Sequence, residues 1–326
     1  MRRLPGILLL TVATLIVIVA LLVSGLRLVL PQLDAWRPQL LEKISALTGT
    51  PVDASQIAAS WQTFGPTLDV RDIHVGLKDG GTMAVKRVTL ALDVWQSLLH
   101  MRWQFRDLTF WQLQVHTNTP IQTNDGGESL KTDRISDLFL RQFDHFTLRD
   151  SHLSFLTISG QRAELAVPQL TWLNGRNRHR AEGQLSLSSL TGQHGVMQVR
   201  MDLRDEDGLL NKGRVWLQAD DIDVKPWLGR WMQDNIALKS ARFSLEGWMT
   251  IEKGDVASGD VWLKKGGASW QGDSEVHHLS VDNLTAHLSH DKQSWGFYSP
   301  DTRIAIDDKP WPSGALAMAW IPAQDV

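Results

Sequence analysis

The sequence predicts a mainly β protein that begins with one transmembrane helix and contains few other helices. Three observations lead to this fold class. Residues 7–26 form an uncharged apolar stretch, residues after about 50 alternate apolar and polar side chains, and glycine-containing turns separate the alternating segments. The chain has 326 residues and no cysteine. This length can form a sizeable core, and the lack of cysteine excludes a disulfide scaffold and a cysteine-based metal site.

The apolar stretch from Ile7 to Leu26 is predicted to be a membrane anchor. About 20 uncharged helical residues cross a hydrocarbon core of roughly 30 Å. Arg2 and Arg3 precede the stretch and only Arg27 closely follows it, so the positive-inside rule puts the N-terminus in the cytoplasm. A cleaved signal peptide is the alternative, but its apolar region is usually only about 7–15 residues long. We therefore expect residues 1–6 to be cytoplasmic, 7–30 to form the anchor, and the body to be exported.

A second helix is predicted over residues 31–49, directly after the anchor. Its apolar side chains recur at helical spacing and Gly49 provides a natural stop. This amphipathic helix either rests on the membrane surface or covers one end of a sheet. Three further short helices are predicted at Trp95–His100, Asp133–Arg141 and Lys225–Asp234.

Residues 50–326 are predicted to form antiparallel strands, with a possible joint near 118–130. Strict alternation with a period of two is typical of strands that have one apolar and one polar face. The clearest alternation places ten apolar side chains on one face: Met197, Val199, Met201, Leu203, Val215, Leu217, Phe243, Leu245, Met249 and Ile251. Turns such as Lys253-Gly254-Asp255 separate the strands, and no strand–helix–strand rhythm of a parallel sheet is visible.

The apolar face of such a sheet must be covered. A second sheet could cover it, giving a closed sandwich or barrel, whereas the predicted helices are too few. The third option is the acyl chains of lipids. Moving a sixteen-carbon chain from hydrocarbon into water costs on the order of 12 kcal/mol, at about 0.8 kcal/mol per methylene, and an apolar trough removes most of that cost. Alternation alone favours the closed sandwich, because most one-sided sheets pack on protein.

The sequence contains none of the patterns that would indicate catalysis. Gly-x-Ser-x-Gly, His-Glu-x-x-His and the phosphate loop are all absent. We therefore expect no enzyme activity, no nucleotide, no cofactor and no metal site. Three of the 33 basic residues lie in the first thirty, which leaves 30 against 36 acidic residues. A body with this charge balance is a poor candidate for binding nucleic acid.

Several stretches of the sequence resemble segments of known proteins. Leu47-Thr48-Gly49 followed by Thr50-Pro51-Val52 is similar to the start of AsmA-like bodies. Longer stretches resemble one long member of the AsmA-like family: RVTLALDVWQSLLHMRWQFRDLTFWQL (87–113), QRAELAVPQLTWLN (161–174), RHRAEG (178–183) and SLTGQHGVMQVRMDLRD (189–205).

This resemblance implies a large periplasmic protein that is anchored in the inner membrane. Its elongated, twisted β-sheet would form a hydrophobic groove that carries phospholipids between inner and outer membrane. This chain would be the N-terminal segment, and the ten alternating residues would contact acyl chains. Phospholipids and the inner membrane are then the expected partners, with outer-membrane or envelope proteins as further candidates. The alternative function is a closed β-domain that acts as a structural or regulatory scaffold in the periplasm.

Overall fold

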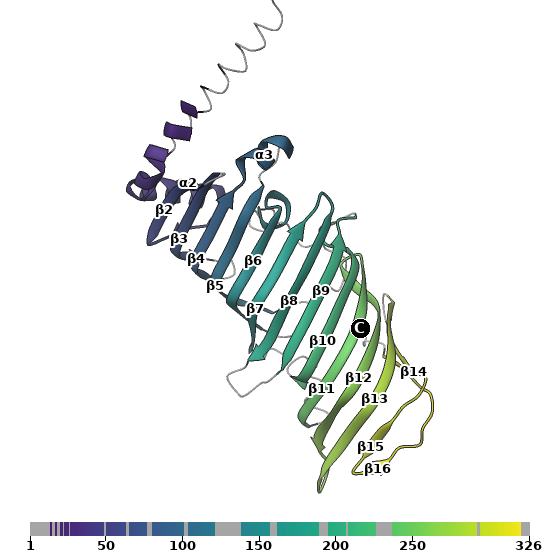
Figure 1. Ribbon diagram of the computed structural model, residues 1–326. Coiled ribbons are helices and arrows are strands. Elements are labelled where there is room, and N and C mark those ends of the chain that lie inside the picture. Colours follow the sequence, from purple (N-terminus) through teal and green to yellow (C-terminus); the bar gives the residue numbers. More distant parts are fainter. Residues whose placement is uncertain are drawn as a thin grey trace, which may run out of the picture.

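The computed structural model is one long sheet with helical segments at its N-terminal end (Figure 1). It describes residues 14, 17, 20, 21, 23–25, 27–48, 50–62, 65–76, 80–100, 104–120, 138–156, 162–188, 195–206, 208–225, 237–291 and 294–320. All seventeen strands in this part of the chain belong to the same sheet. The mainly β class with few helices is therefore confirmed. The sandwich of two sheets that alternation alone favoured is wrong.

The strands are β1 (Val52–Asp53), β2 (Gln56–Gln62), β3 (Gly65–Gly76), β4 (Thr82–Leu92), β5 (Phe105–Pro120), β6 (His145–Leu156), β7 (Arg162–Asn174), β8 (Arg178–Ser188), β9 (Val196–Arg204), β10 (Lys212–Asp223), β11 (Leu238–Glu252), β12 (Asp255–Gln271), β13 (Val276–Asp291), β14 (Ser294–Ser299), β15 (Ile304–Ile306), β16 (Lys309–Pro310) and β17 (Leu316–Trp320). The helical segments are η1 (Leu30–Trp36), α2 (Arg37–Thr48), α3 (Val94–His100) and η2 (Leu138–Gln142).

The strands lie side by side almost in chain order. β1 and β2 both pair with β3, and from β3 to β13 each strand pairs with the next. β14 and β15 both pair with β13, β17 pairs with β14, and β16 pairs with β15. These pairings are antiparallel, with one exception among the described strands: β5 and β6 are parallel. The prediction that all strands are antiparallel is wrong at this pair. The stretch between Pro120 and His145 is long enough for the crossover connection that parallel strands need.

A line of β-bulges crosses the sheet. Asp72, Gln112, Asp150, Asp221 and Asn283 have φ angles of 50°, 51°, 48°, 53° and 65°. At each position the pairing register skips or shifts. Bulges bend a strand and increase its twist, so a line of them curves the whole sheet along its length. Asp and Asn tolerate this left-handed backbone better than most residues, and three of the five are Asp.

The bulges also keep the apolar side chains on one face. In β5, Leu108 and Phe110 precede the bulge at Gln112, while Leu113 and Val115 follow it, and all four pack in one cluster. Plain alternation would put the second pair on the opposite face, because 110 and 113 differ in parity. The same change of parity at Asp72 joins two alternating stretches, residues 68–70 and 73–76, into the single strand β3.

One of the three predicted short helices is observed, and the structure describes only parts of the other two. α3 confirms the helix at Trp95–His100, and its N-terminus is capped where the Gln96 backbone N–H donates to Asp93 Oδ1 at 3.0 Å. The preceding strand β4 ends at Leu92, just before this helix. Of the predicted helix at 133–141, only residues 138–141 are described, within η2. Most of the predicted helix at 225–234 lies outside the described residues.

The predicted helix over residues 31–49 is observed as η1 followed by α2, at the β2 end of the sheet (Figure 1). The Ile57 backbone N–H donates to Asp34 Oδ1 at 2.9 Å, and the Val52 N–H donates to Ser45 Oγ at 2.9 Å. These segments therefore cover one end of the sheet. Ile7 and Leu26, the ends of the predicted anchor, lie outside the described residues. In the described part, no helix is both long and apolar enough to cross a membrane.

A histidine–aspartate pair lies at the start of β6. His145 Nδ1 is 3.1 Å from Asp144 Oδ2, and the Phe105 backbone N–H donates to Asp144 Oδ1 at 3.4 Å. The hydrogen bond to Asp144 raises the pKa of His145, against the opposing effect of burial. Burial raises the pKa of Asp144, but its hydrogen bonds and the nearby His145 charge outweigh this effect, so the net pKa is lowered.

The first prediction concerns the bulge at Gln112. Gln112→Val should lower the free energy of unfolding by about 1–2 kcal/mol, because a β-branched side chain clashes with the left-handed backbone. Gln112→Gly should leave stability nearly unchanged, since glycine adopts this conformation readily. The measurement is urea unfolding of the detergent-solubilised chain, followed by circular dichroism. Equal stability of the two variants would show that the bulge imposes no strain.

The second prediction concerns pH. The raised pKa of His145 contributes stability that is fully present below its unfolded value of 6.5 and is lost as the pH rises through the folded value. The lowered pKa of Asp144 contributes stability that is present above 3.8 and is lost as the pH falls through the folded value. The stability difference between the natural chain and His145→Gln should therefore shrink over the range in which the pH rises above about 6.5. A difference that stays constant over this range would contradict the assignment.

Candidate functional site

The pairing registers place all ten residues of the predicted apolar set on one face of β9, β10 and β11. Directly opposite residues in an antiparallel ladder share a face. The cross-strand rows are Met201–Val215–Met249, Val199–Leu217, Met197–Ala219–Leu245 and Leu203–Gly213–Ile251. Phe243 lies two positions from Leu245 on β11, so it projects from the same face. Sequence alternation therefore located this part of the face correctly.

The same rows continue onto strands that the predicted set did not include. Val261 and Ala286 extend the row of Leu217, and Leu263 and Leu284 extend the row of Leu245. On the other side, Leu185 of β8 lies opposite Met197. The apolar face thus runs without interruption from β8 to β13.

A search for alternating apolar side chains misses these additional residues, because glycines and bulges interrupt the alternation. Gly247 occupies a position on the apolar face, opposite Leu217 and Val261. A Cβ there would lie 2.8 Å from the backbone oxygen of Asp260, so the strands approach too closely for any side chain. In β13 the bulge at Asn283 reverses the parity between Val281 and Leu284, although both belong to one cluster.

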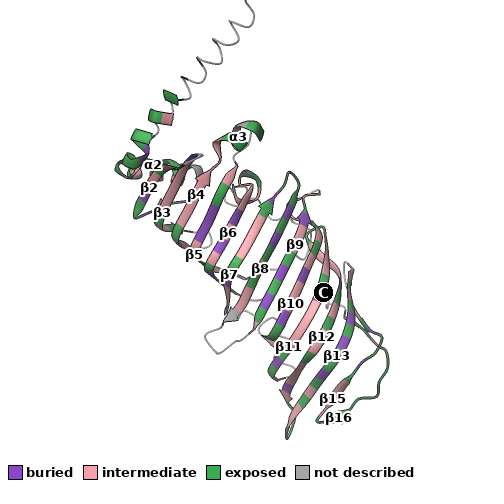
Figure 2. Cartoon of the chain, viewed as in Figure 1, coloured by how far each residue is buried: buried purple, intermediate pink, exposed green. Residues whose placement is uncertain are grey.

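Three of the ten residues are buried and the other seven are half-buried (Figure 2). Met197, Val199 and Leu203 on β9 are buried at 7%, 8% and 7% exposure. In the described part of the chain, the side chains packed against Met197 come from strands of this same sheet and from Val224 just after β10. The seven half-buried residues keep accessible apolar surface; Met201 lies on β9, and the other six, including Leu217 and Leu245, lie on β10 and β11.

The apolar face over β5 to β7 differs, because a short helical segment covers it. Leu108, Phe110 and Leu148 are only 1%, 8% and 7% exposed. Phe139 of η2 and Phe143 pack against this cluster in addition to the strand residues. The apolar face of the sheet is thus covered over β5–β7 and partly accessible over β10 and β11.

The opposite face of the same strands carries paired charges. Arg200 lies 2.9 Å from Glu182, Lys264 lies 2.8 Å from Glu246, and His287 lies 2.9 Å from Asp260. The hydrogen bond from Lys264 lowers the pKa of Glu246. Arg178 likewise lowers the pKa of Asp202. The lowered pKa values keep the Glu246 and Asp202 carboxylates charged at neutral pH, which favours hydration of this face.

Cationic side chains lie over two of the tryptophan rings on this polar face. The Arg200 guanidinium lies 5.2 Å from the Trp216 ring centroid, and the Lys264 ammonium lies 5.0 Å from that of Trp262. Trp216 also contacts Trp248, with ring centroids 6.3 Å apart.

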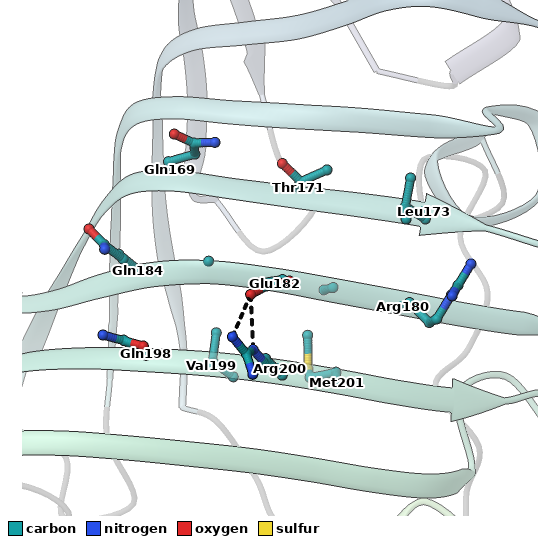
Figure 3. A pocket seen from close by; sticks show the side chains of 12 residues that line it. Gln169, Thr171, Leu173, Arg180, Glu182, Gln184, Gln198, Val199, Arg200 and Met201 are labelled. Carbon is teal, nitrogen blue, oxygen red and sulfur yellow. Dashed lines mark hydrogen bonds and ion pairs between the residues drawn. The ribbon is translucent and has the colours of Figure 1, made fainter.

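Two hollows also lie on the polar face. The larger, of about 660 Å³, spans β7, β8 and β9 and is lined by side chains such as Gln169, Gln184 and Gln198, with the Glu182–Arg200 ion pair in it (Figure 3). The second, of about 550 Å³, surrounds Asp69 and Arg87 on β3 and β4. Amide and charged linings suit water and polar ligands, and they do not suit alkyl chains. Among the described residues, no group of three or more His, Asp or Glu is placed to hold a metal ion.

Comparison with known proteins places the chain in a family. The family model described as YhdP protein matches residues 1–326. Over all 326 residues the chain is 74% identical to the intermembrane phospholipid transporter YhdP of Escherichia coli (strain K12), and it spans 26% of that protein's length. No solved structure matches it. These matches confirm the resemblance indicated by residues 87–113 and 161–174, and the chain belongs to the YhdP family.

Proposed function

We propose that this chain binds the acyl chains of phospholipids on the apolar face of β8–β13 and forms part of a route between inner and outer membrane. The observation that carries this proposal is the alignment of apolar residues in continuous rows across neighbouring strands, with accessible surface at residues such as Leu217 and Leu245. The Escherichia coli relative, whose N-terminal part this chain matches, is named as an intermembrane phospholipid transporter.

The proposed role is non-enzymatic. Each methylene that stays in contact with apolar side chains saves about 0.8 kcal/mol relative to water, so rows of such side chains lower the cost of moving a tail along the sheet. The rows run across the strands, and therefore along the long axis of the sheet in Figure 1. At about 4.8 Å between strands, the stretch from β2 to β13 extends over roughly 50–60 Å. Binding and release along this path require no covalent step.

The proposed location is the cell envelope. Residues 7–30 would anchor the chain in the inner membrane with residues 1–6 in the cytoplasm, and residues 50–326 would lie in the periplasm. The charge pattern of Arg2, Arg3 and the uncharged stretch after them supports this topology. η1 and α2 lie at the β2 end of the sheet, so this end would face the inner membrane.

A pair of neighbouring residues gives the most direct test. A photo-crosslinking side chain at Leu217 should capture phospholipid in membranes, whereas the same group at Gln218 should not, because the two positions project from opposite faces of β10. Captured lipid is identified by mass spectrometry of the crosslinked chain. Equal capture at both positions, or capture at neither, would contradict lipid binding on this face.

A charge on the apolar face should also block binding. Leu217→Asp or Leu245→Asp should reduce co-purified phospholipid by at least about fivefold, because an acyl chain would have to pack against a carboxylate. Gln218→Asp adds the same charge on the polar face and serves as the control. Circular dichroism should show an unchanged β-sheet in all three variants. Unfolding of the two leucine variants would instead favour a packed structural core and a scaffold function.

A further inference from the structure

η2 covers one part of the apolar face and leaves another part accessible. Over β5–β7 the cluster around Leu108, Phe110 and Leu148 is buried and has η2 packed on it, whereas Leu217 and Leu245 on β10 and β11 remain half-buried. We propose that η2 is a plug that keeps acyl chains off the apolar face of β5–β7 until it moves away, and that Asn174 holds the plug in place. This inference rests on the proposed function, since it concerns access of lipid to the same apolar face.

The phenylalanines of this segment occupy the place where an acyl chain would lie. The Phe139 ring centroid is 5.2 Å from that of Phe110 on β5 and 5.2 Å from that of Phe146 on β6. Phe143 packs edge-on against Phe105 at 5.6 Å and against Phe139 at 5.5 Å. These rings bridge two strands on their apolar side, so a lipid tail and η2 cannot both contact the same surface.

One buried side chain holds the segment through two hydrogen bonds. Asn174, at the end of β7 and 8% exposed, donates from Nδ2 to the backbone oxygens of Phe139 at 2.7 Å and Phe143 at 2.9 Å. Its Oδ1 accepts from Trp172 Nε1 at 2.7 Å and lies 2.7 Å from Nδ1 of the buried His179. Every hydrogen-bonding position of this amide is thus used, and the side chain cannot rotate without losing several bonds at once.

The contacts of Asn174 extend from η2 to the neighbouring strand β8. His179 is 1% exposed, lies opposite Leu203 in the β8–β9 pairing, and places Nε2 3.3 Å from Asp205 Oδ1. Asn174 therefore connects η2 over β5–β7 with β8 and, through His179, with the end of β9. The backbone of η2 has π-helical geometry, which is rare and is often found at functional positions. Release of two hydrogen bonds and of the phenylalanine contacts would uncover β5–β7 without breaking a strand.

The test uses the full chain in vesicles of phosphatidylethanolamine and phosphatidylglycerol, with a diazirine analogue of leucine at either position 148 or position 217. In the otherwise natural chain, we expect the diazirine at Leu217 to capture phospholipid and the one at Leu148 to capture little. Phe139→Ala, which keeps Asn174, should raise capture at position 148 by at least about fivefold and leave position 217 nearly unchanged. Asn174→Ala should have the same effect. Phe297→Ala is the control, because Phe297 lies on the apolar face near β13 and away from η2.

Two outcomes would contradict the proposal that η2 is a plug. Equal capture at positions 148 and 217 in the natural chain would show that β5–β7 is already open to lipid. Unchanged low capture at position 148 in Phe139→Ala, with normal circular dichroism and normal capture at position 217, would show that η2 is only a structural brace. If Asn174→Ala loses its β-sheet signal, Phe139→Ala alone decides between these results. Absence of capture at both positions in every variant would instead overturn the proposed function, and the plug with it.

Discussion

The structure depends on one constraint: a single sheet has to keep all its apolar side chains on the same face while it bends. Alternation alone cannot satisfy this constraint in long strands, because bending requires local departures from regular pairing. The bulges at positions such as Gln112, Asp150 and Asn283 provide the bend and shift the alternation by one residue at the same point. Each long strand therefore presents apolar side chains to one side along both of its halves.

The bend also affects how far the side chains of the apolar face are exposed to solvent. On a curved sheet, side chains from neighbouring strands pack against one another, which explains why Met197 is buried although its packing neighbours in the described chain are strand residues and Val224. The same curvature leaves Leu217 and Leu245 half-buried. A surface of this kind is stable without a second layer and still offers contacts to an acyl chain, which is the property that the proposed transport function needs.

The polar face has the complementary role. Its side chains form cross-strand ion pairs such as Arg200–Glu182 and Lys264–Glu246, and cationic groups lie over the rings of Trp216 and Trp262. Exposed ion pairs add little to stability, but they keep this face hydrated. The two faces thus differ in polarity, so an acyl chain is expected to contact the apolar face and not the charged one. Over β5–β7 the chain covers its own apolar face with η2, so access to that face varies along the sheet.

The sequence by itself determined the β class, the family and the ten alternating residues of β9–β11. The ten residues could be found because the alternation within 197–203, 215–217 and 243–251 runs without a change of parity, so it reports directly which side chains share a face. The sequence also located α3, whose capping residue Asp93 is readable from sequence. The single sheet, the parallel pairing of β5 with β6, the extension of the apolar rows to Leu263 and Leu284, and the plug by Phe139 were decided by tertiary structure. The reason is that a strand pattern does not specify its pairing partner, and bulges and glycines interrupt the pattern where the sheet bends.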